Sequence, residues 1–178
     1  GGYGDNVMKL MVSQNAPFVP MYDAWRADSR AMLPYDADKA RRDAGIIDAK
    51  VLSNRKPPYP IKGGLYDALK ATNGEILVAT NAQARKAAKL FEELEGVDIH
   101  PAAAVATATL IKAVQDGKVE KDATIMLNIT GAGEQAFKSS HDVYELKPTK
   151  VFALNATEEQ VIKAVEEMFA EKAPENEN

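Results

Sequence analysis

The sequence contains no cysteine, only two histidines and no long apolar segment. The absence of cysteine excludes disulfide bonds, thiolate metal ligands and a cysteine nucleophile, and it fits a reducing compartment. His100 and His141 are too far apart in the sequence to form a metal-ligand spacing, so no metal site is expected. The apolar runs are too short to span a bilayer, and the first residues lack the pattern of a signal peptide. We therefore expect a cytoplasmic protein without a membrane partner.

No charge of one sign is in large excess. The 22 basic and 26 acidic residues are interspersed and leave a net charge of −4. Because no basic face is indicated, we expect no nucleic-acid partner. A length of 178 residues with 46% hydrophobic content is enough for one domain with a core of its own.

Strand and helix patterns alternate along the chain. Apolar segments predict strands at residues 8–12, 49–53, 75–79, 123–129 and 150–154. Helical periodicity predicts helices at residues 18–30, 36–44, 65–72, 80–95, 101–116 and 158–170. This alternation is typical of an α/β fold with three layers, a mainly parallel sheet with helices on both faces. The strands are few for a chain of this length, which suggests that part of the sheet lies elsewhere.

Two helix starts carry a capping box, a Thr followed three residues later by Gln. They are Thr80 with Gln83 and Thr157 with Gln160. We expect a flexible glycine-rich start at 1–6, a single α/β domain at 7–170 and a polar tail at 171–178.

A hydroxyl and two glycines follow the apolar segment 123–129. Thr130 comes directly after the expected strand, and Gly131 and Gly133 turn the chain. In open α/β sheets, ligands lie just outside the carboxyl ends of parallel strands, and glycines allow close backbone approach. The pattern indicates a place to hold a flat polar ligand, although a strand-ending turn produces the same pattern.

Several segments, in this order, resemble the C-terminal part of the threonine synthase branch of pyridoxal-phosphate enzymes, which have the tryptophan synthase β-like fold. They are KLMVSQNAPF, VLSNRKPPYPIKGGLYDAL, EILVAT, EGVDIHPAAAVATATLIKAVQDGKV and TIMLNITGAG. The segment GVDIHPAAA is similar to the G-I-x-x-E-P-A-S-A helix start of that branch, with His100 in place of Glu. Within the branch, SQNAPFVPMYDAW and NRKPPYPIKGGLYDAL look closest to the cysteate synthase family of methanogenic archaea.

The resemblance implies a transferase or lyase of amino-acid biosynthesis. The cysteate synthase family makes cysteate and phosphate from phosphoserine and sulfite, on the way to coenzyme M. The alternative within the branch is threonine synthase, which makes threonine and phosphate from phosphohomoserine and water. A non-catalytic α/β module for ligand binding or assembly is a further alternative. A nicotinamide-binding domain is disfavoured because no G-x-G-x-x-G follows the first strand.

The resemblance also implies cofactor-binding residues. In the family, a threonine or serine after the last core strand bonds the pyridine nitrogen of pyridoxal phosphate, and Thr130 stands at that position. A neutral hydroxyl there favours β-elimination and replacement over transamination. Gly131 and Gly133 would let the backbone pass the edge of the ring.

Substrate-side candidates lie on two loops. Asn54 and Arg55 occupy a loop that lines the active site in relatives, and a guanidinium suits a phosphate or sulfonate. A surface arginine beside a rigid proline loop is the competing interpretation. Gln14 and Asn15 are further candidates. For His100 we expect a buried or half-exposed histidine with a backbone partner.

Two parts of such an enzyme are absent from this sequence. The family's Schiff-base lysine lies in a Ser-x-Lys-x-Arg-like context, and a glycine loop holds the cofactor phosphate; neither motif occurs here. We therefore expect a C-terminal fragment of a longer enzyme, with no catalytic residue of its own, inactive alone and not retaining the cofactor. Its expected partners are the missing N-terminal part, a small phospho-amino acid and further copies of itself, because uncovered apolar faces and strand edges favour association.

Overall fold

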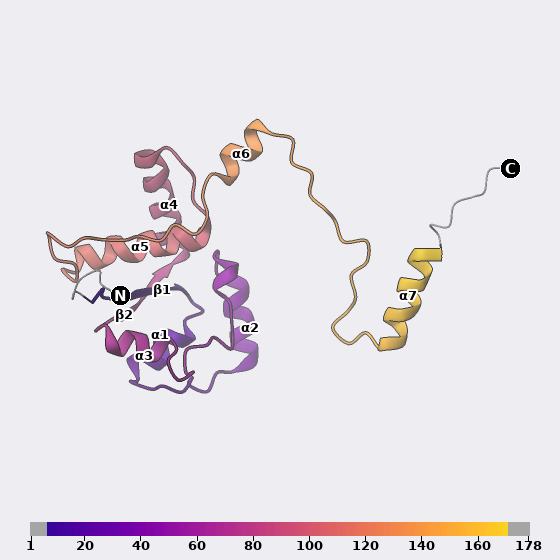
Figure 1. Cartoon of the computed structure of the whole chain (residues 1–178), viewed down its shortest axis with the longest axis horizontal. Coiled ribbons are helices and arrows are strands. Elements are labelled where there is room, and N and C mark those ends of the chain that lie inside the picture. The colour runs from indigo at the N-terminus through magenta and orange to yellow at the C-terminus, as the bar shows by residue number, and fades with distance from the viewer. Residues whose placement is uncertain (1–6, 171–178) are drawn as a thin grey trace. The chain divides into compact units, whose positions relative to one another are not determined.

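The computed structural model describes residues 7–170, so the expected start at 1–6 and tail at 171–178 lie outside the described residues. The chain divides into two units, residues 1–142 and 143–178, and each is described by itself (Figure 1). A single domain over 7–170 stays a prediction.

The first unit contains a parallel pair of strands. β1 (Met11–Ala16) and β2 (Glu75–Thr80) pair along their whole length. The connection between them carries four helices, α1 (Pro20–Arg26), α2 (Ala37–Ile46), the 3₁₀ helix η1 (Lys50–Leu52) and α3 (Leu65–Ala71). Parallel neighbours require such a crossover connection. The α/β character is therefore as predicted, but the sheet found in residues 7–170 has two strands.

Helices cover both faces of this pair (Figure 1). Successive side chains of a strand point to opposite faces. Ile76 of β2 packs with Ala24 of α1 and Leu69 of α3. Ala79, three residues later, belongs instead to the core formed with α4 (Asn81–Glu95) and α5 (Pro101–Gln115).

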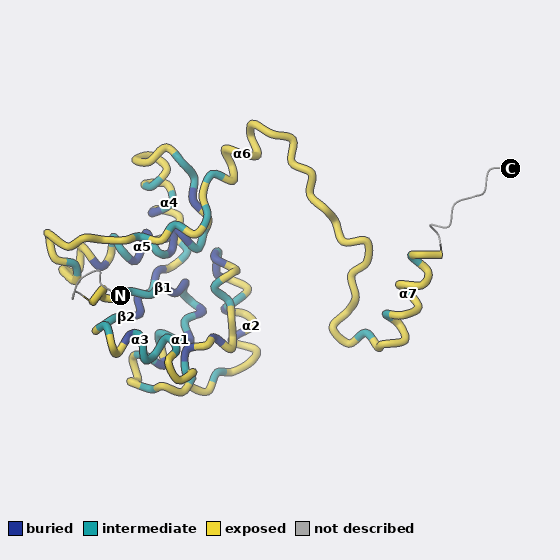
Figure 2. Tube along the Cα trace, in the orientation of Figure 1, coloured by how far each residue is buried: buried dark blue, intermediate teal, exposed yellow. Residues whose placement is uncertain are grey.

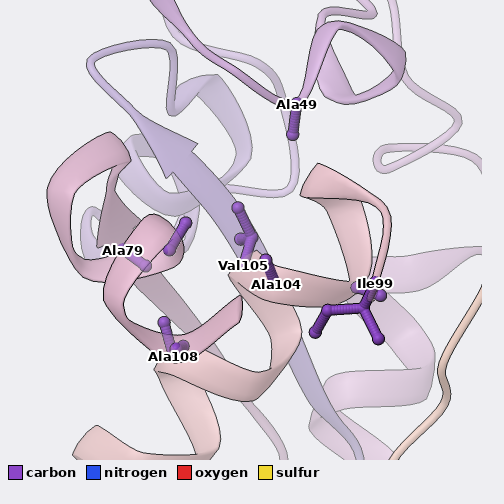
Figure 3. Packing of buried hydrophobic residues seen from close by; sticks show 9 residues of the cluster. Ala49, Ala79, Ile99, Ala104, Val105 and Ala108 are labelled. Atoms are coloured by element: carbon purple, nitrogen blue, oxygen red, sulfur yellow. The ribbon is translucent and has the colours of Figure 1, made fainter. Parts of the chain in front are cut away.

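The second of these cores is built largely from alanine. Ala79, Ala104 and Ala108 lie close together in it, with Val105 and Ile99 beside them (Figure 3). Small side chains let α5 approach the strands closely. At the same interface the hydroxyls of Ser13 in β1 and Thr109 in α5 are 2.6 Å apart.

Both predicted capping boxes are confirmed. At α4, the Thr80 hydroxyl accepts a hydrogen bond from the Gln83 amide at 3.3 Å, and the Gln83 side chain accepts one from the Thr80 amide at 2.9 Å. Thr157 and Gln160 make the same pair of bonds, at 3.3 and 3.0 Å. Gly96 ends α4 in the left-handed conformation, at φ 73°.

Three strand predictions are wrong. Residues 123–129 and 150–154 belong to no strand, because a strand needs a backbone neighbour and neither segment has one among the described residues. Most of the segment 123–129 is consequently exposed (Figure 2). Ile125 and Met126 are among its exposed side chains. In the segment 49–53, residues Lys50–Leu52 form η1 instead, and the amide of Ala49 donates to the side chain of Asn15 and not to a neighbouring strand.

The first strand also begins later than predicted, at Met11 instead of residue 8, and includes a stretch expected to be loop. Two further helical predictions differ in detail, since α1 is shorter than 18–30 and α2 continues through Gly45. A short helix, α6 (Glu134–Ser140), follows the glycine turn.

The second unit, as far as residue 170, contains α7 (Glu158–Ala170). Most of this helix is exposed (Figure 2). Ile162, Val165 and Phe169 form an apolar stripe on it, and all three side chains are exposed. Within residues 7–170, no helix combines the length and apolar character needed to cross a membrane.

Replacing Thr80 by Ala should destabilise the first unit by about 1 kcal/mol, because the amide of Gln83 loses its side-chain acceptor. Urea unfolding followed through Trp25, the one tryptophan of the chain, measures this change. Thr157→Ala is the matched control, since it removes the same cap from the other unit and should leave the Trp25 transition within about 0.5 kcal/mol of the parent. Equal midpoints for T80A and the parent would refute the expectation.

Candidate functional site

The carboxyl ends of β1 and β2 are joined by the side chain of Asn15, which is completely buried. Its amide nitrogen donates to the carbonyl of Ala79 at 3.1 Å and to Oδ1 of Asn81 at 3.0 Å. Its oxygen accepts from the amide of Ala49 at 3.1 Å. One side chain thus fastens both strands, the start of α4 and the entry to η1.

Asn81 extends this network outward. Its Oδ1 also accepts from the amide of Asp48 at 3.0 Å, and its Nδ2 donates to the carbonyl of Ile46 at 2.9 Å. Asp48 in turn binds Arg85 of α4 through two bonds of 2.7 and 2.9 Å. We call Asn15, Asn81 and their partners the strand-end network.

Gln14 is buried too, and its Oε1 accepts a hydrogen bond from the amide of Tyr22 at 2.7 Å. This bond places the side chain against the start of α1. Gln14 and Asn15 were predicted as substrate-side residues, and that role stays a prediction; in the structure their amide groups bind the protein itself.

Residues 130–133 lie beside the start of α5. The amide of His100 donates to the carbonyl of Gly131, and the amide of Gly133 donates to the carbonyl of Asp98, each at 2.8 Å. The prediction that His100 is buried or half-exposed is wrong, because its side chain is exposed; the bond to Gly131 is donated by its backbone amide.

The carboxylate of Asp98 fixes the next helix. It accepts hydrogen bonds from the amides of Gln135 at 3.0 Å and Ala136 at 3.3 Å, at the first turn of α6. These bonds, that from Gln135 first, hold the pKa of Asp98 below its ordinary value. The backbone after Thr130 is thus held in one arrangement.

Packing accounts for both glycines of the turn. A Cβ on Gly131 would lie 3.1 Å from Cβ of His100, and Gly133 has a φ of 74°, which favours glycine. Thr130 itself is exposed, and no hydrogen bond of its hydroxyl is found within residues 7–170.

Asn54 and Arg55 line an open groove of about 540 Å³ between their loop, α2 and the start of α1. Phe18, Met32 and Leu33 are among its apolar walls. Thr130 does not line this groove, so the structure does not bring the two predicted halves of the site into one cavity.

Several residues of these sites were not predicted from the sequence. They are Asn81 and Asp48 in the strand-end network, Asp98 beside the glycine turn, and Tyr35 and Lys56 in the groove. Two of them could have been predicted from the sequence. Asn81 directly follows a strand that ends in a capping threonine, and Lys56 directly follows Arg55.

Parallel strands joined by helical connections, with polar groups gathered where the strands end, define the first unit as a mixed α/β domain. No protein-family model matches the chain. Comparison with curated proteins finds cysteate synthases. Those of Methanosarcina barkeri and Methanosarcina mazei are each 46% identical over 149 residues, which is 83% of this chain and 36% of theirs. That of Methanocella arvoryzae is 38% identical over 167 residues, 93% of this chain and 40% of its own.

The chain is therefore homologous to part of cysteate synthase, as the sequence motifs indicated. It spans about a third of the length of most of these relatives, which come from methanogenic archaea.

Asn15→Asp should destabilise the first unit by about 3 kcal/mol near neutral pH, because a buried carboxylate would face the carbonyl of Ala79 with no donor between them. Burial raises the pKa of such a carboxyl, so the loss should shrink as the pH falls and the group is protonated. Urea unfolding at several pH values measures both effects.

Asn54→Asp is the control for that variant. Asn54 is exposed and uses its oxygen to accept from the amide of Lys56 at 2.9 Å, a bond that Asp retains. Its stability should stay within about 0.5 kcal/mol of the parent. Comparable losses of unfolding free energy in Asn15→Asp and Asn54→Asp would contradict a central role for Asn15.

Asp98→Ala should release the first turn of α6. Hydrogen exchange at the amides of Gln135 and Ala136 should accelerate about fivefold, because both lose their acceptor. In the parent, the lowered pKa of Asp98 means that this protection is present above the ordinary pKa of the carboxyl and is lost as the pH falls through the lowered value. Unchanged exchange in the variant would show that the two bonds do not hold the helix.

Proposed function

We propose that this chain supplies the C-terminal third of a cysteate synthase, which converts phosphoserine and sulfite to cysteate and phosphate with pyridoxal phosphate. The supporting observation is 46% identity over 83% of the chain to proteins with that name. The same proposal extends to a cytoplasmic location and to assembly into a homo-oligomer.

Thr130 is the residue of this chain proposed to meet the cofactor. Pyridoxal phosphate supplies a ring that accepts electrons during elimination and replacement at the β carbon. An exposed hydroxyl without an internal partner fits the role of hydrogen-bond donor to an unprotonated ring nitrogen. The bond that the His100 amide donates to Gly131 and the bond that the Asp98 carbonyl accepts from Gly133 support this role, because they hold the backbone beside Thr130 in place.

Gly131 and Gly133 give weaker support. The close packing of Gly131 on His100 and the positive φ of Gly133 are explained within the chain. The two glycines are therefore consistent with a ring nearby but do not require one. The backbone between them is nevertheless free of bulky side chains, which is what passage along a flat ring needs.

The anionic substrate group is proposed to meet Arg55, with Asn54 beside it. Both side chains are exposed on the groove, and guanidinium groups bind phosphate through paired hydrogen bonds. The lysine that carries the cofactor and the loop that holds its phosphate would come from residues outside this sequence. Exposed apolar segments such as 123–129 would be covered in the complete enzyme.

A fused enzyme tests the proposal. The part of the Methanosarcina barkeri cysteate synthase that precedes its match to this chain is joined ahead of Val7, and cysteate formation is assayed with phosphoserine, sulfite and pyridoxal phosphate. We expect cysteate from the fusion and none from the chain alone. Threonine from phosphohomoserine, without cysteate, would transfer the assignment to threonine synthase; no product from either substrate would overturn it.

Thr130→Val in the fused enzyme should lower the rate of cysteate formation at least about tenfold, because the hydroxyl that meets the ring nitrogen is lost. Thr130→Ser keeps the hydroxyl and should stay within about threefold of the parent. The visible absorption of bound cofactor should shift in the Val variant alone. Since Thr130 is exposed, neither change should alter the unfolding free energy by more than about 0.5 kcal/mol.

A further inference from the structure

The groove beside the loop 53–59 combines apolar walls with a cationic rim. Phe18 is buried at its base, and Met32 and Leu33 form part of its sides. Arg55 and Lys56 line it at the loop. A volume of about 540 Å³ falls in the range of sites for small organic molecules.

The aromatic wall of this groove is held rigidly. Tyr35 packs edge-to-face on Phe18, with ring centroids 5.9 Å apart. Its hydroxyl donates to Oδ2 of Asp43 at 3.2 Å, and the ammonium of Lys39 lies 5.4 Å from its ring centroid. Burial raises the pKa of Tyr35, so the ring and its hydroxyl remain neutral over the physiological range.

The two cations of the rim make no ion pair with any residue of 7–170. Their loop is nevertheless anchored. Asn54 accepts from the amide of Lys56 at 2.9 Å, and the completely buried Tyr59 donates to the carbonyl of Ser29 at 2.9 Å. Cations on an anchored loop lose little freedom when they bind an anion.

Among residues 7–170 no carboxylate lines the groove, and Asp36 and Asp43, at the start of α2 and within it, are engaged. Asp36 accepts from the amide of Lys39 at 2.6 Å, and Asp43 pairs with the ammonium of Lys39. The ion pair with Lys39 holds the pKa of Asp43 below its ordinary value, so that carboxylate stays charged and committed to its partners. The positive rim is therefore not neutralised from within the groove.

The geometry points to a binding site for a small organic anion that has an oxyanion head and an apolar body. The head lies between Arg55 and Lys56, and the body lies on Tyr35, Met32 and Leu33. This inference does not rest on the proposed function, whose substrate phosphoserine offers a suitable head but no apolar body.

Titration of the ¹⁵N-labelled chain with phenyl phosphate tests the inference by amide chemical shifts. We expect shifts in residues around the groove, and a Kd at least about tenfold lower than that of inorganic phosphate or phosphoserine, because only phenyl phosphate also uses the apolar walls. Equal affinities for the three probes would show that the walls contribute nothing and would overturn the inference.

Variants test the contributions of the oxyanion head and of the apolar body to binding separately. Arg55→Gln with Lys56→Gln should raise the Kd for phenyl phosphate at least about tenfold. The control Lys62→Gln with Lys86→Gln, an equal loss of two charges at exposed sites outside the groove, should alter it less than about twofold. Leu33→Ala should raise the Kd for phenyl phosphate about threefold and leave the Kd for inorganic phosphate unchanged.

The site would be refuted if phenyl phosphate changed amide chemical shifts elsewhere in the chain and not at the groove. An equal loss of affinity in the control with Lys62→Gln and Lys86→Gln would refute it too. These outcomes are independent of cysteate formation in the fused enzyme, so the two proposals fail separately.

Discussion

One buried amide holds the first unit together. Asn15 has no exposed surface and joins β1 to β2, α4 and η1 through hydrogen bonds to Ala79, Asn81 and Ala49. An amide transferred from water into an apolar interior is costly unless it is fully hydrogen-bonded. Those bonds can form only if all four segments are in place, so Asn15 makes their arrangement mutually dependent. Two strands give a small sheet, and this network compensates by locking the place where both strands end.

In contrast to the buried and fully hydrogen-bonded Asn15, some apolar side chains are left exposed to water. Residues 123–129 and the stripe on α7 contain many side chains suited to a core. Within their own units most of 123–129 and the whole stripe are nevertheless exposed, although Ile129 packs against the alanine-rich core. Such surface costs free energy in water and favours a covering partner. The relatives are about three times as long as the segment they share with this chain, which makes further residues of the same enzyme the natural candidate in our proposal.

Two separate places in the first unit have the chemistry of a binding site. At Thr130 a hydroxyl stands next to a backbone fixed by Asp98, whereas at the groove two cations stand next to an aromatic wall. The strand-end network lies at the carboxyl edge of the sheet, where α/β domains place their ligands, and its polar groups are already used internally. In our proposals the ligands therefore meet the neighbouring loops and not the strand ends themselves.

Local signals in the sequence were sufficient for both ends of α4, for the start of α7, for β2 and for the relation to cysteate synthase. A capping box such as Thr80 with Gln83 involves residues within a single turn, and the motifs depend only on order along the chain. Strand pairing and burial depend on residues far apart in sequence, so they were decided by tertiary structure. The polar residues Gln14 and Asn15 became buried parts of a strand, and the apolar segment 123–129 remained unpaired, because hydrophobicity indicates what a segment can pack against but not whether a neighbour is there.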